Sequence, residues 1–369
     1  MDRKVCILLP RTGVYPGLGA MLAETFSGAG WQAAVCHQAR IDVLDQDLLL
    51  LVGQCRNIDG LPKVLRQRQG KRPVTALWQL EPLPPAELSS EGERIGLRAA
   101  AFDWGRMPRT ARRVLNLVVP FRTKLMRTGQ RWLARPYSKR VILESGHQGW
   151  ERYDVDHYVV ALAEWRWISR ARAGGWVDHY FASNRPRVQF LRSRGIQAET
   201  IPVGYHEGWG RDLQSNRDID VLFLGNPGRD PRGVALQQLN EQLALRGRRF
   251  TLVRGAYGKS REQWLNRARI VLSLLRLPHD LAGMRVLLGM ACGALVVSEH
   301  CNDTDAYRPG EHFVMANLNE LPGVIDYYLA HEDERQKIAR QGHRFVTQEL
   351  TLSNMLRKML QQIETTAPS

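Results

Sequence analysis

The sequence predicts an α/β protein of two domains, each built on a parallel sheet with helices on its faces. With 369 residues, the chain is longer than one ordinary hydrophobic core supports, and two domains suit its length. Apolar runs of strand length alternate with helical segments through both halves. Glycines, prolines and arginines stand at the junctions that follow the strands of the second half. In a parallel sheet those junctions lie at the carboxyl edge, where α/β proteins bind ligands.

The first domain, residues 1–204, is predicted to begin with a buried strand at residues 5–9. The segment 47–53 (DLLLLVG) is continuously apolar, as a parallel strand covered on both faces should be. Further strands are predicted at residues 31–35, 74–80, 141–144, 179–183 and 199–203, with helices at 20–26, 91–104, 151–172 and 185–194. A cluster of Pro202, Gly204 and Gly208 places the domain boundary near Gly204.

The second domain, residues 205–369, repeats the alternation. Its strands are predicted at residues 221–224, in the run FTLV, at residues 270–275 and in the run VVSE, and helical segments separate them. The charged tail up to Ile363 is helical in pattern. We expect this last helix to pack back on the first domain.

Charge and cysteine usage limit the class of protein. The formal net charge is +15, which predicts an acidic partner such as a phosphorylated small molecule, an anionic membrane surface or nucleic acid, unless it reflects an arginine-rich composition alone. The five cysteines are scattered without CxxC spacing and indicate reduced thiols. The chain enters a strand directly after its first residues, and its longest apolar run, 286–297, is too short to cross a bilayer. We therefore expect a cytoplasmic protein.

The order of the motifs resembles that of glycosyltransferases of the GT-B fold, in particular the glycosyltransferase group 1 family. The second half reads DVLFLGNPG, FTLVRG, RIVLSLLRLPHDLAGMRVLLGMACGALVVSE and YRPGEHFV, and the first domain closes with FASNRPRVQFLRSRGIQAETIPVGYH. The resemblance is strong in the second half and looser in the first. It implies two Rossmann-like domains that face each other across a cleft. It also implies transfer of a sugar from a nucleotide-diphosphate sugar, with no metal or other cofactor. Retention of the sugar's configuration is expected, and inversion is the alternative.

A donor diphosphate has to be met by helix N-termini, backbone N–H groups and basic side chains. After the first strand of the second domain, LGNPGRDPRG supplies Gly225, Arg229 and Arg232. The next junction, VRGAYGKS, supplies Arg254 and Lys259, and the resemblance places the nucleotide base near this loop. The competing interpretation is that these are turn residues with solvated arginines.

The third junction departs from the family pattern. The resemblance implies two glutamates separated by seven residues, the first for the donor sugar and the second for the ribose hydroxyls. Here those positions hold Asp280 and Leu288, and Leu288 cannot hydrogen-bond a ribose. Asp280 could equally cap the helix that starts near residue 282. Arg285, one turn along that helix, is predicted to reach a phosphate.

Further candidates lie at loops of both domains. Gly17 and Gly19 follow the first strand, where the resemblance implies close approach to the reacting centre, and Gly310 and Glu311 stand in a loop that it places near the sugar or diphosphate. His147, in the loop SGHQG, is predicted to orient the sugar together with Asp280, unless it is a surface residue.

The segment between Arg106 and Arg140 is basic, contains no Asp or Glu, and has apolar residues interleaved. Such a pattern is typical of a helix on an anionic membrane surface, although an ordinary covering helix or a site for an anionic acceptor fits it too. The predicted acceptor is a hydroxyl of a glycan, a lipid-linked saccharide or a cell-surface polymer. No nucleic-acid module is recognised, so nucleic acid is not expected as a partner. The alternative function is a catalytically degenerate GT-B relative that binds or scaffolds at the membrane surface.

Overall fold

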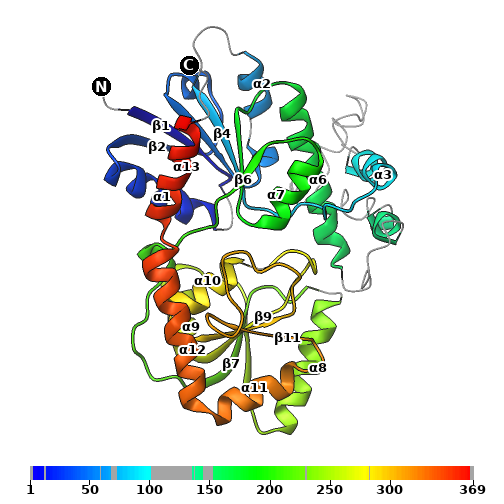
Figure 1. Ribbon diagram of the computed structural model, residues 1–369, viewed down its shortest axis with the longest axis vertical. Helices are drawn as coiled ribbons and strands as arrows, with labels where there is room; N and C mark the ends of the chain where they lie inside the picture. The colour runs from blue at the N-terminus through cyan, green and yellow to red at the C-terminus, as the bar shows by residue number, and fades with distance from the viewer. Residues whose placement is uncertain are drawn as a thin grey trace, which may run out of the picture.

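The computed structural model describes residues 3–11, 14–58, 60–67, 73–100, 135–136, 138–143, 153–228, 231–281 and 283–365. His147, Arg229 and most of the basic segment between Arg106 and Arg140 lie outside the described residues. The chain forms two α/β domains, which lie one above the other in Figure 1.

The first domain contains a six-stranded parallel sheet in the order β2-β1-β3-β4-β5-β6. All five residues of the central strand β3 are buried, which confirms that it is covered on both faces. The strands are β1 (Arg3–Leu8), β2 (Trp31–Cys36), β3 (Leu48–Val52), β4 (Val74–Gln79), β5 (His179–Ala182) and β6 (Ala198–Thr200). The helices are α1 (Tyr15–Gly28), α2 (Leu61–Arg66), α3 (Ser90–Ala100), α6 (Val155–Ala173) and α7 (Arg185–Ser193).

One predicted strand of this domain is wrong. Residues 138–143 are helical, so the run at 141–144 does not join the sheet. Ser138, Val141 and Ile142 are buried while Lys139 and Arg140 are exposed, which is the i, i+3, i+4 spacing of one helix face. A short apolar run does not distinguish a buried strand from a buried helical turn.

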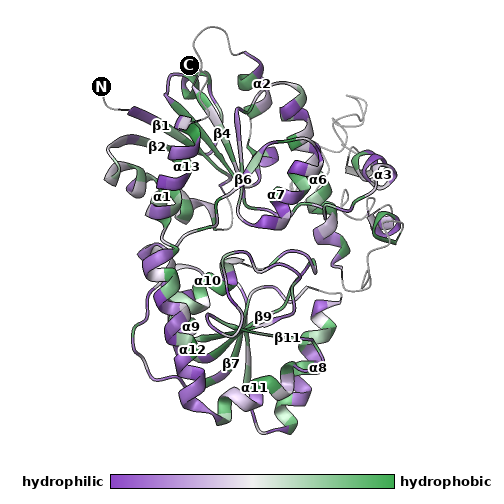
Figure 2. Ribbon diagram, in the orientation of Figure 1, coloured by the Kyte–Doolittle hydropathy of each residue, from purple (hydrophilic) through white to green (hydrophobic). Residues whose placement is uncertain are grey.

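The second domain contains a five-stranded parallel sheet in the order β11-β10-β9-β7-β8. Figure 2 shows apolar strands at the centre of each domain and polar residues on the outer helices. The strands are β7 (Ile219–Leu224), β8 (Phe250–Val253), β9 (Ala268–Ser273), β10 (Leu295–Glu299) and β11 (Val314–Ala316). The helices are α8 (Arg232–Leu245), α9 (Gly258–Arg267), α10 (Gly283–Ala291), α11 (Leu321–Ala330), α12 (Glu332–Arg344) and α13 (Leu352–Thr365).

The chain passes between the domains twice, and the two passages are hydrogen-bonded side by side. The Tyr205 N–H donates to the Leu350 carbonyl, and the Leu352 N–H donates to the Tyr205 carbonyl, both at 2.7 Å. A side chain on Gly204 would overlap with the backbone of Thr351, which explains the glycine at this point. Helix α13 then packs against α1 in the first domain (Figure 1). The exact domain boundary remains a prediction.

Among the helices of the described residues, none combines the length and the hydrophobicity that a bilayer crossing requires.

Candidate active site in the cleft between the domains

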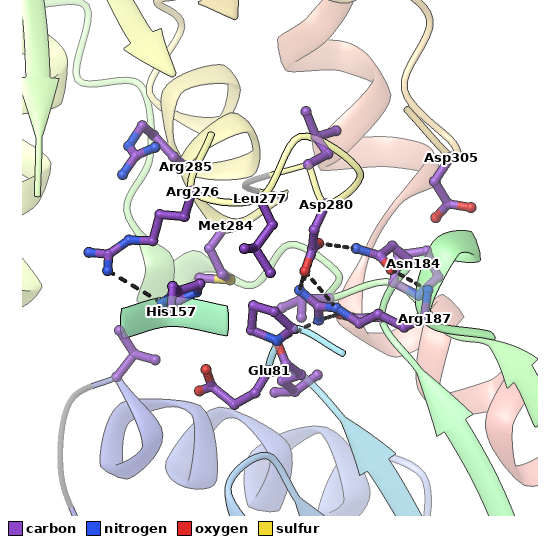
Figure 3. Close-up of a pocket in the computed structure, with 18 of the residues that line it drawn as sticks. Glu81, His157, Asn184, Arg187, Arg276, Leu277, Asp280, Met284, Arg285 and Asp305 are labelled. Carbon is purple, nitrogen blue, oxygen red and sulfur yellow. Dashed lines mark hydrogen bonds and ion pairs between the residues drawn. The ribbon is translucent and has the colours of Figure 1, made fainter. Parts of the chain in front are cut away.

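A cavity of about 310 Å³ lies between the two domains, at the carboxyl ends of both sheets. Its floor includes apolar side chains such as Leu18, Leu277 and Met284. The polar groups converge from both domains (Figure 3). The first domain supplies Tyr15, Glu81, His157, Asn184 and Arg187, and the second supplies Arg232, Arg276, Asp280, Arg285 and Asp305.

Two arginines of the second domain are held in place by backbone carbonyls at the strand ends. Arg232 is the first residue of α8 and is 4% exposed; its Nε donates to the Pro227 carbonyl at 3.0 Å. Arg285, in the first turn of α10, donates from Nε to the Leu224 carbonyl at 3.2 Å. Both guanidinium groups lie over the ring of Phe223, at 5.6 and 4.7 Å from its centroid. These contacts fix two positive charges beside the cavity.

Arg276 brings a third positive charge to the same place, and we call these three residues the arginine cluster (Arg232, Arg276 and Arg285). Burial, together with the charges of Arg276 and Arg285, lowers the pKa of Arg232 to about 9. Burial and the charge of Arg276 lower the pKa of Arg285 to about 10. Arg232 and Arg285 therefore remain protonated near pH 7, and the guanidinium groups of the cluster repel one another. An anion bound among them would relieve that repulsion.

Three helices begin at this part of the cavity. Helices α8 and α10 start at Arg232 and Gly283. Helix α6 is capped by Asp154, whose carboxylate accepts a hydrogen bond from the His157 N–H at 3.1 Å. Helix N-termini carry partial positive charge and unpaired N–H groups, so they favour anions. Asp154 lies 3.7 Å from the Arg276 guanidinium and offsets part of its charge. The geometry therefore suits a ligand with more than one negative charge.

Asp280 joins the domains on another side of the cavity. Its carboxylate accepts three hydrogen bonds from Arg187 at 2.9 to 3.2 Å and one from the Asn184 side chain at 2.6 Å (Figure 3). Arg187 also donates to the Leu80 carbonyl and to the Ser183 hydroxyl, both at 2.5 Å. The predicted contact of Asp280 with a sugar would therefore require its oxygens to be shared with these donors.

The other predicted residues of the second domain that the structure describes are not among the lining residues of the cavity. Gly225 has a φ of +139°, and an added Cβ would come 3.2 Å from Arg285 Nη2, so this glycine makes room for the arginine. Arg254 and Lys259 are exposed beyond β8, the edge strand of the sheet. Glu311 pairs with Arg308 at 2.8 Å in a turn that the Gly310 N–H closes by donating to Phe313.

Leu288 and the two glycines of the first domain have packing environments. Leu288 is 7% exposed and belongs to the main hydrophobic core. Gly17 is exposed on α1, and Gly19 packs closely against Leu9 and Val35. None of the three is among the described lining residues. The first turn of α1 contributes Tyr15 and Leu18 instead.

Sequence reasoning missed several polar residues of the lining, among them Glu81, Arg187 and Arg276, and two of these three carry a readable signal. Arg276 and Glu81 are each among the first polar residues after a buried strand, which is the same signal that identified Arg232. Arg187 has no such signal, because its role depends on contact with a residue 93 positions away. No group of three or more His, Cys, Asp or Glu side chains in the described part of the chain is arranged to hold a metal ion.

Comparison with known proteins agrees with the expected family and fold. Residues 232–361 match a family model described as "Glycosyl transferase-like". A search of curated proteins gave no match. The structure is similar to the sucrose-phosphate synthase of Thermosynechococcus elongatus, with a TM-score of 0.54, 11% identity and 99% of each chain covered. It is also similar to a glycosyltransferase from Rickettsia africae, with a TM-score of 0.51, 10% identity and 99% and 98% of the two chains covered. The GT-B fold and the resemblance to group 1 glycosyltransferases are thus confirmed.

Proposed function

We propose, from the glycosyltransferase-like family and the GT-B fold of this chain, that the protein transfers a sugar from a nucleotide-diphosphate sugar to a hydroxyl group. The observation that carries the proposal is the arginine cluster, in which three guanidinium groups face one cavity between the domains. A diphosphate matches this cluster in charge, and arginine forks match phosphate oxygens in geometry.

In this proposal the arginine cluster acts mainly on the leaving group. When the bond between the sugar and the diphosphate breaks, the diphosphate gains negative charge. Donors that are already fixed in position stabilise that charge without reorganising, which is the largest single contribution in many enzymes. Arg232 and Arg285 meet this requirement because backbone carbonyls hold both guanidinium groups. Arg276 would complete the set from the loop after β9.

Two finer features of the reaction belong to the proposal. The first is that the arginines neutralise the diphosphate, so that transfer proceeds without a metal ion. Activity that survives EDTA treatment would support this. The second is retention of the sugar's configuration, which NMR of the product anomer at early times would test directly.

The acceptor is proposed to be a glycan, a lipid-linked saccharide or a cell-surface polymer. The basic composition between Arg106 and Arg140 supports a reaction near an anionic membrane surface. Sedimentation with vesicles that contain anionic lipid, compared with purely zwitterionic vesicles, tests this part. Equal binding to both kinds of vesicle would remove it.

A second candidate function is that of a non-catalytic binding protein with the same fold. Leu288 favours it, because a buried leucine stands where the family pattern has a glutamate for the ribose. Hydrolysis of the donor separates the two candidates. Slow release of nucleoside diphosphate from a nucleotide sugar, lost in Arg285→Ala, supports an enzyme, whereas binding without turnover supports the alternative.

The main test is thermal stabilisation by a panel of nucleoside diphosphates and their sugar esters. A ligand present at 100 times its Kd stabilises the folded state by about 2.7 kcal/mol, which a melting experiment resolves. Arg285→Ala should abolish the shift. Arg246→Ala, which removes an exposed arginine just beyond α8, should leave it intact. If no nucleotide shifts the melting temperature of the intact protein, the proposed function is wrong.

A further inference from the structure

The cavity is also lined by side chains of the opposite charge. Glu81, Asp280 and Asp305 line it, and Arg187 is the cation among them. In Figure 3 the Glu81 side chain lies below Arg276 and Arg285 in the view, and Asp280 and Asp305 lie toward the other side. The cavity therefore presents carboxylates to a ligand as well as the guanidinium groups of the arginine cluster.

Asp280 and Asp305 already have cationic partners. Asp280 forms a buried pair with Arg187 at 2.9 Å. Asp305 lies 3.9 Å from Arg185. Glu81 differs from both, because no ion pair to it is found within the described residues. Its carboxylate is the one with the most capacity to accept hydrogen bonds from a ligand.

Glu81 is nevertheless fixed in place. It follows β4 directly, and its Oε1 accepts a hydrogen bond from the buried Tyr15 hydroxyl. Burial, followed by the nearby charge of Glu81, raises the pKa of Tyr15, so the hydroxyl stays protonated and keeps donating. The backbone carbonyl of Glu81 also accepts from the Gln79 side chain at 3.0 Å. One carboxylate oxygen is thus used for positioning, and the other is left for the cavity.

We propose that Glu81 is a specificity-determining residue that binds hydroxyl groups of a neutral sugar and rejects donors whose sugar carries a carboxylate. This inference rests on the proposed function and deepens it by naming the class of sugar. A carboxylate accepts charge-assisted hydrogen bonds from hydroxyls, so a neutral hexose is favoured. A uronic acid would place a second carboxylate beside Glu81 and would be repelled, as in sites that exclude a competitor by like charge.

Arg187 does not cancel this repulsion. Its guanidinium is committed to Asp280, to the Leu80 carbonyl and to Ser183. Arg187 therefore leaves the negative charge of Glu81 without an ion pair among the described residues. Like charges about 4 Å apart in a partly solvated site oppose each other enough to lower affinity by about tenfold or more.

The test compares matched donors on the full-length protein. UDP, GDP, ADP and dTDP are first screened for binding by calorimetry. Kd is then measured for the glucose and glucuronate esters of the nucleotide that binds. We expect the intact protein to bind the glucose ester at least about tenfold more tightly. Glu81→Gln, which keeps the shape and removes the charge, should narrow that preference by about tenfold and change the Kd of the bare diphosphate by less than about twofold.

Two further variants control for folding and for general charge. Tyr15→Phe removes the hydroxyl that orients Glu81. It should reduce the preference for the glucose ester over the glucuronate ester, but by less than Glu81→Gln does. If Glu81→Gln does not fold, Tyr15→Phe decides the matter. Glu87→Gln removes an exposed carboxylate on the same loop and should leave the preference unchanged.

The outcomes separate the two proposals. The role of Glu81 is overturned if the intact protein binds the glucuronate ester as tightly as the glucose ester or more tightly. It is also overturned if the preference for the glucose ester is unchanged in both Glu81→Gln and Tyr15→Phe. Neither result affects the proposal that the protein binds a nucleotide. If none of the diphosphates binds, the proposed function itself falls and this inference falls with it.

Discussion

Removing the Arg187 guanidinium should destabilise the protein far more than removing an exposed arginine. The Arg187 and Asp280 side chains are 8% and 4% exposed, and they join the two domains. In Arg187→Met the Asp280 carboxylate would stay buried with the Asn184 amide as its remaining partner from the other domain. Loss of one member of a buried ion pair costs about 3–5 kcal/mol, because the other charge remains desolvated.

A double-mutant cycle measures whether that cost comes from the pair. Arg187→Met and Asp280→Leu are made singly and together, and thermal and urea unfolding are followed for each. For a domain of this size, 3–5 kcal/mol corresponds to a fall of roughly 10 °C in Tm. The double variant buries no charge at this point, so it should be more stable than the sum of the single effects predicts, by at least about 2 kcal/mol.

The control is the exposed ion pair of Arg192, which lies on the same helix α7, less than two turns beyond Arg187. Arg192 and Glu199 form a pair at 2.8 Å whose side chains are 51% and 52% exposed. Exposed pairs contribute at most about 1 kcal/mol, so Arg192→Met should barely change Tm. If Arg187→Met and Arg192→Met lower Tm equally, the buried pair does not hold the domains together. The same conclusion follows if the effects of the two single substitutions in the cycle simply add.

Three further results are expected. Arg276→Gln should weaken nucleoside diphosphate binding by about tenfold to a hundredfold and flatten its salt dependence, because a charge-assisted contact is lost; calorimetry at two salt concentrations checks this, and unchanged affinity would remove Arg276 from the site. Burial raises the pKa of Glu164 to about 7 from the usual 4.5, so the folded state binds more protons than the unfolded state between these values. Stability should therefore fall as pH rises from about 4.5 to about 7, by up to about 3 kcal/mol, and Glu164→Gln should flatten that slope in urea unfolding at several pH values. Gly204→Ala should lower Tm, since its side chain would overlap with Thr351, whereas Gly323→Ala on α11 has open space around it and should raise Tm slightly; equal shifts would refute the packing argument.

The elements of the sheets could be read from the sequence because strands covered on both faces leave continuous apolar runs. The run at β3 is buried at every position, and the runs at β7 and β9 are buried at most positions. A continuous apolar run also led to the predicted strand at residues 141–144, and that prediction is wrong. Residues 141–143 are helical, and the next residue lies outside the described ranges. Length and composition alone do not separate these cases, because tertiary packing decides them.

The candidate site was partly predictable for a related reason. Topology brings the residues that follow parallel strands to one edge, so Arg232 and Arg285 could be identified from their position in the chain. Position does not tell which strand lies at the edge of the sheet. Arg254 follows β8 and has the same local pattern as Arg232, but β8 is the outermost strand and Arg254 is exposed. Contacts between the domains, such as Arg187 with Asp280, leave no local pattern at all.

Two of the interdomain contacts beside the cavity share one loop with the arginine cluster. On one side the Asp154 N–H donates to the Arg276 carbonyl at 2.9 Å, and on the other side Arg187 pairs with Asp280. Both contacts use the loop between β9 and α10, which also places Arg276 in the arginine cluster. A ligand that binds to the arginine cluster would therefore contact the loop between β9 and α10, which also makes the contacts between the domains. Since a ligand shifts an equilibrium only through its different affinity for the two states, nucleotide binding and the Arg187–Asp280 contact should be thermodynamically coupled. In the double-mutant cycle described above, nucleotide affinity should fall together with Tm in Arg187→Met, although Arg187 is not part of the arginine cluster.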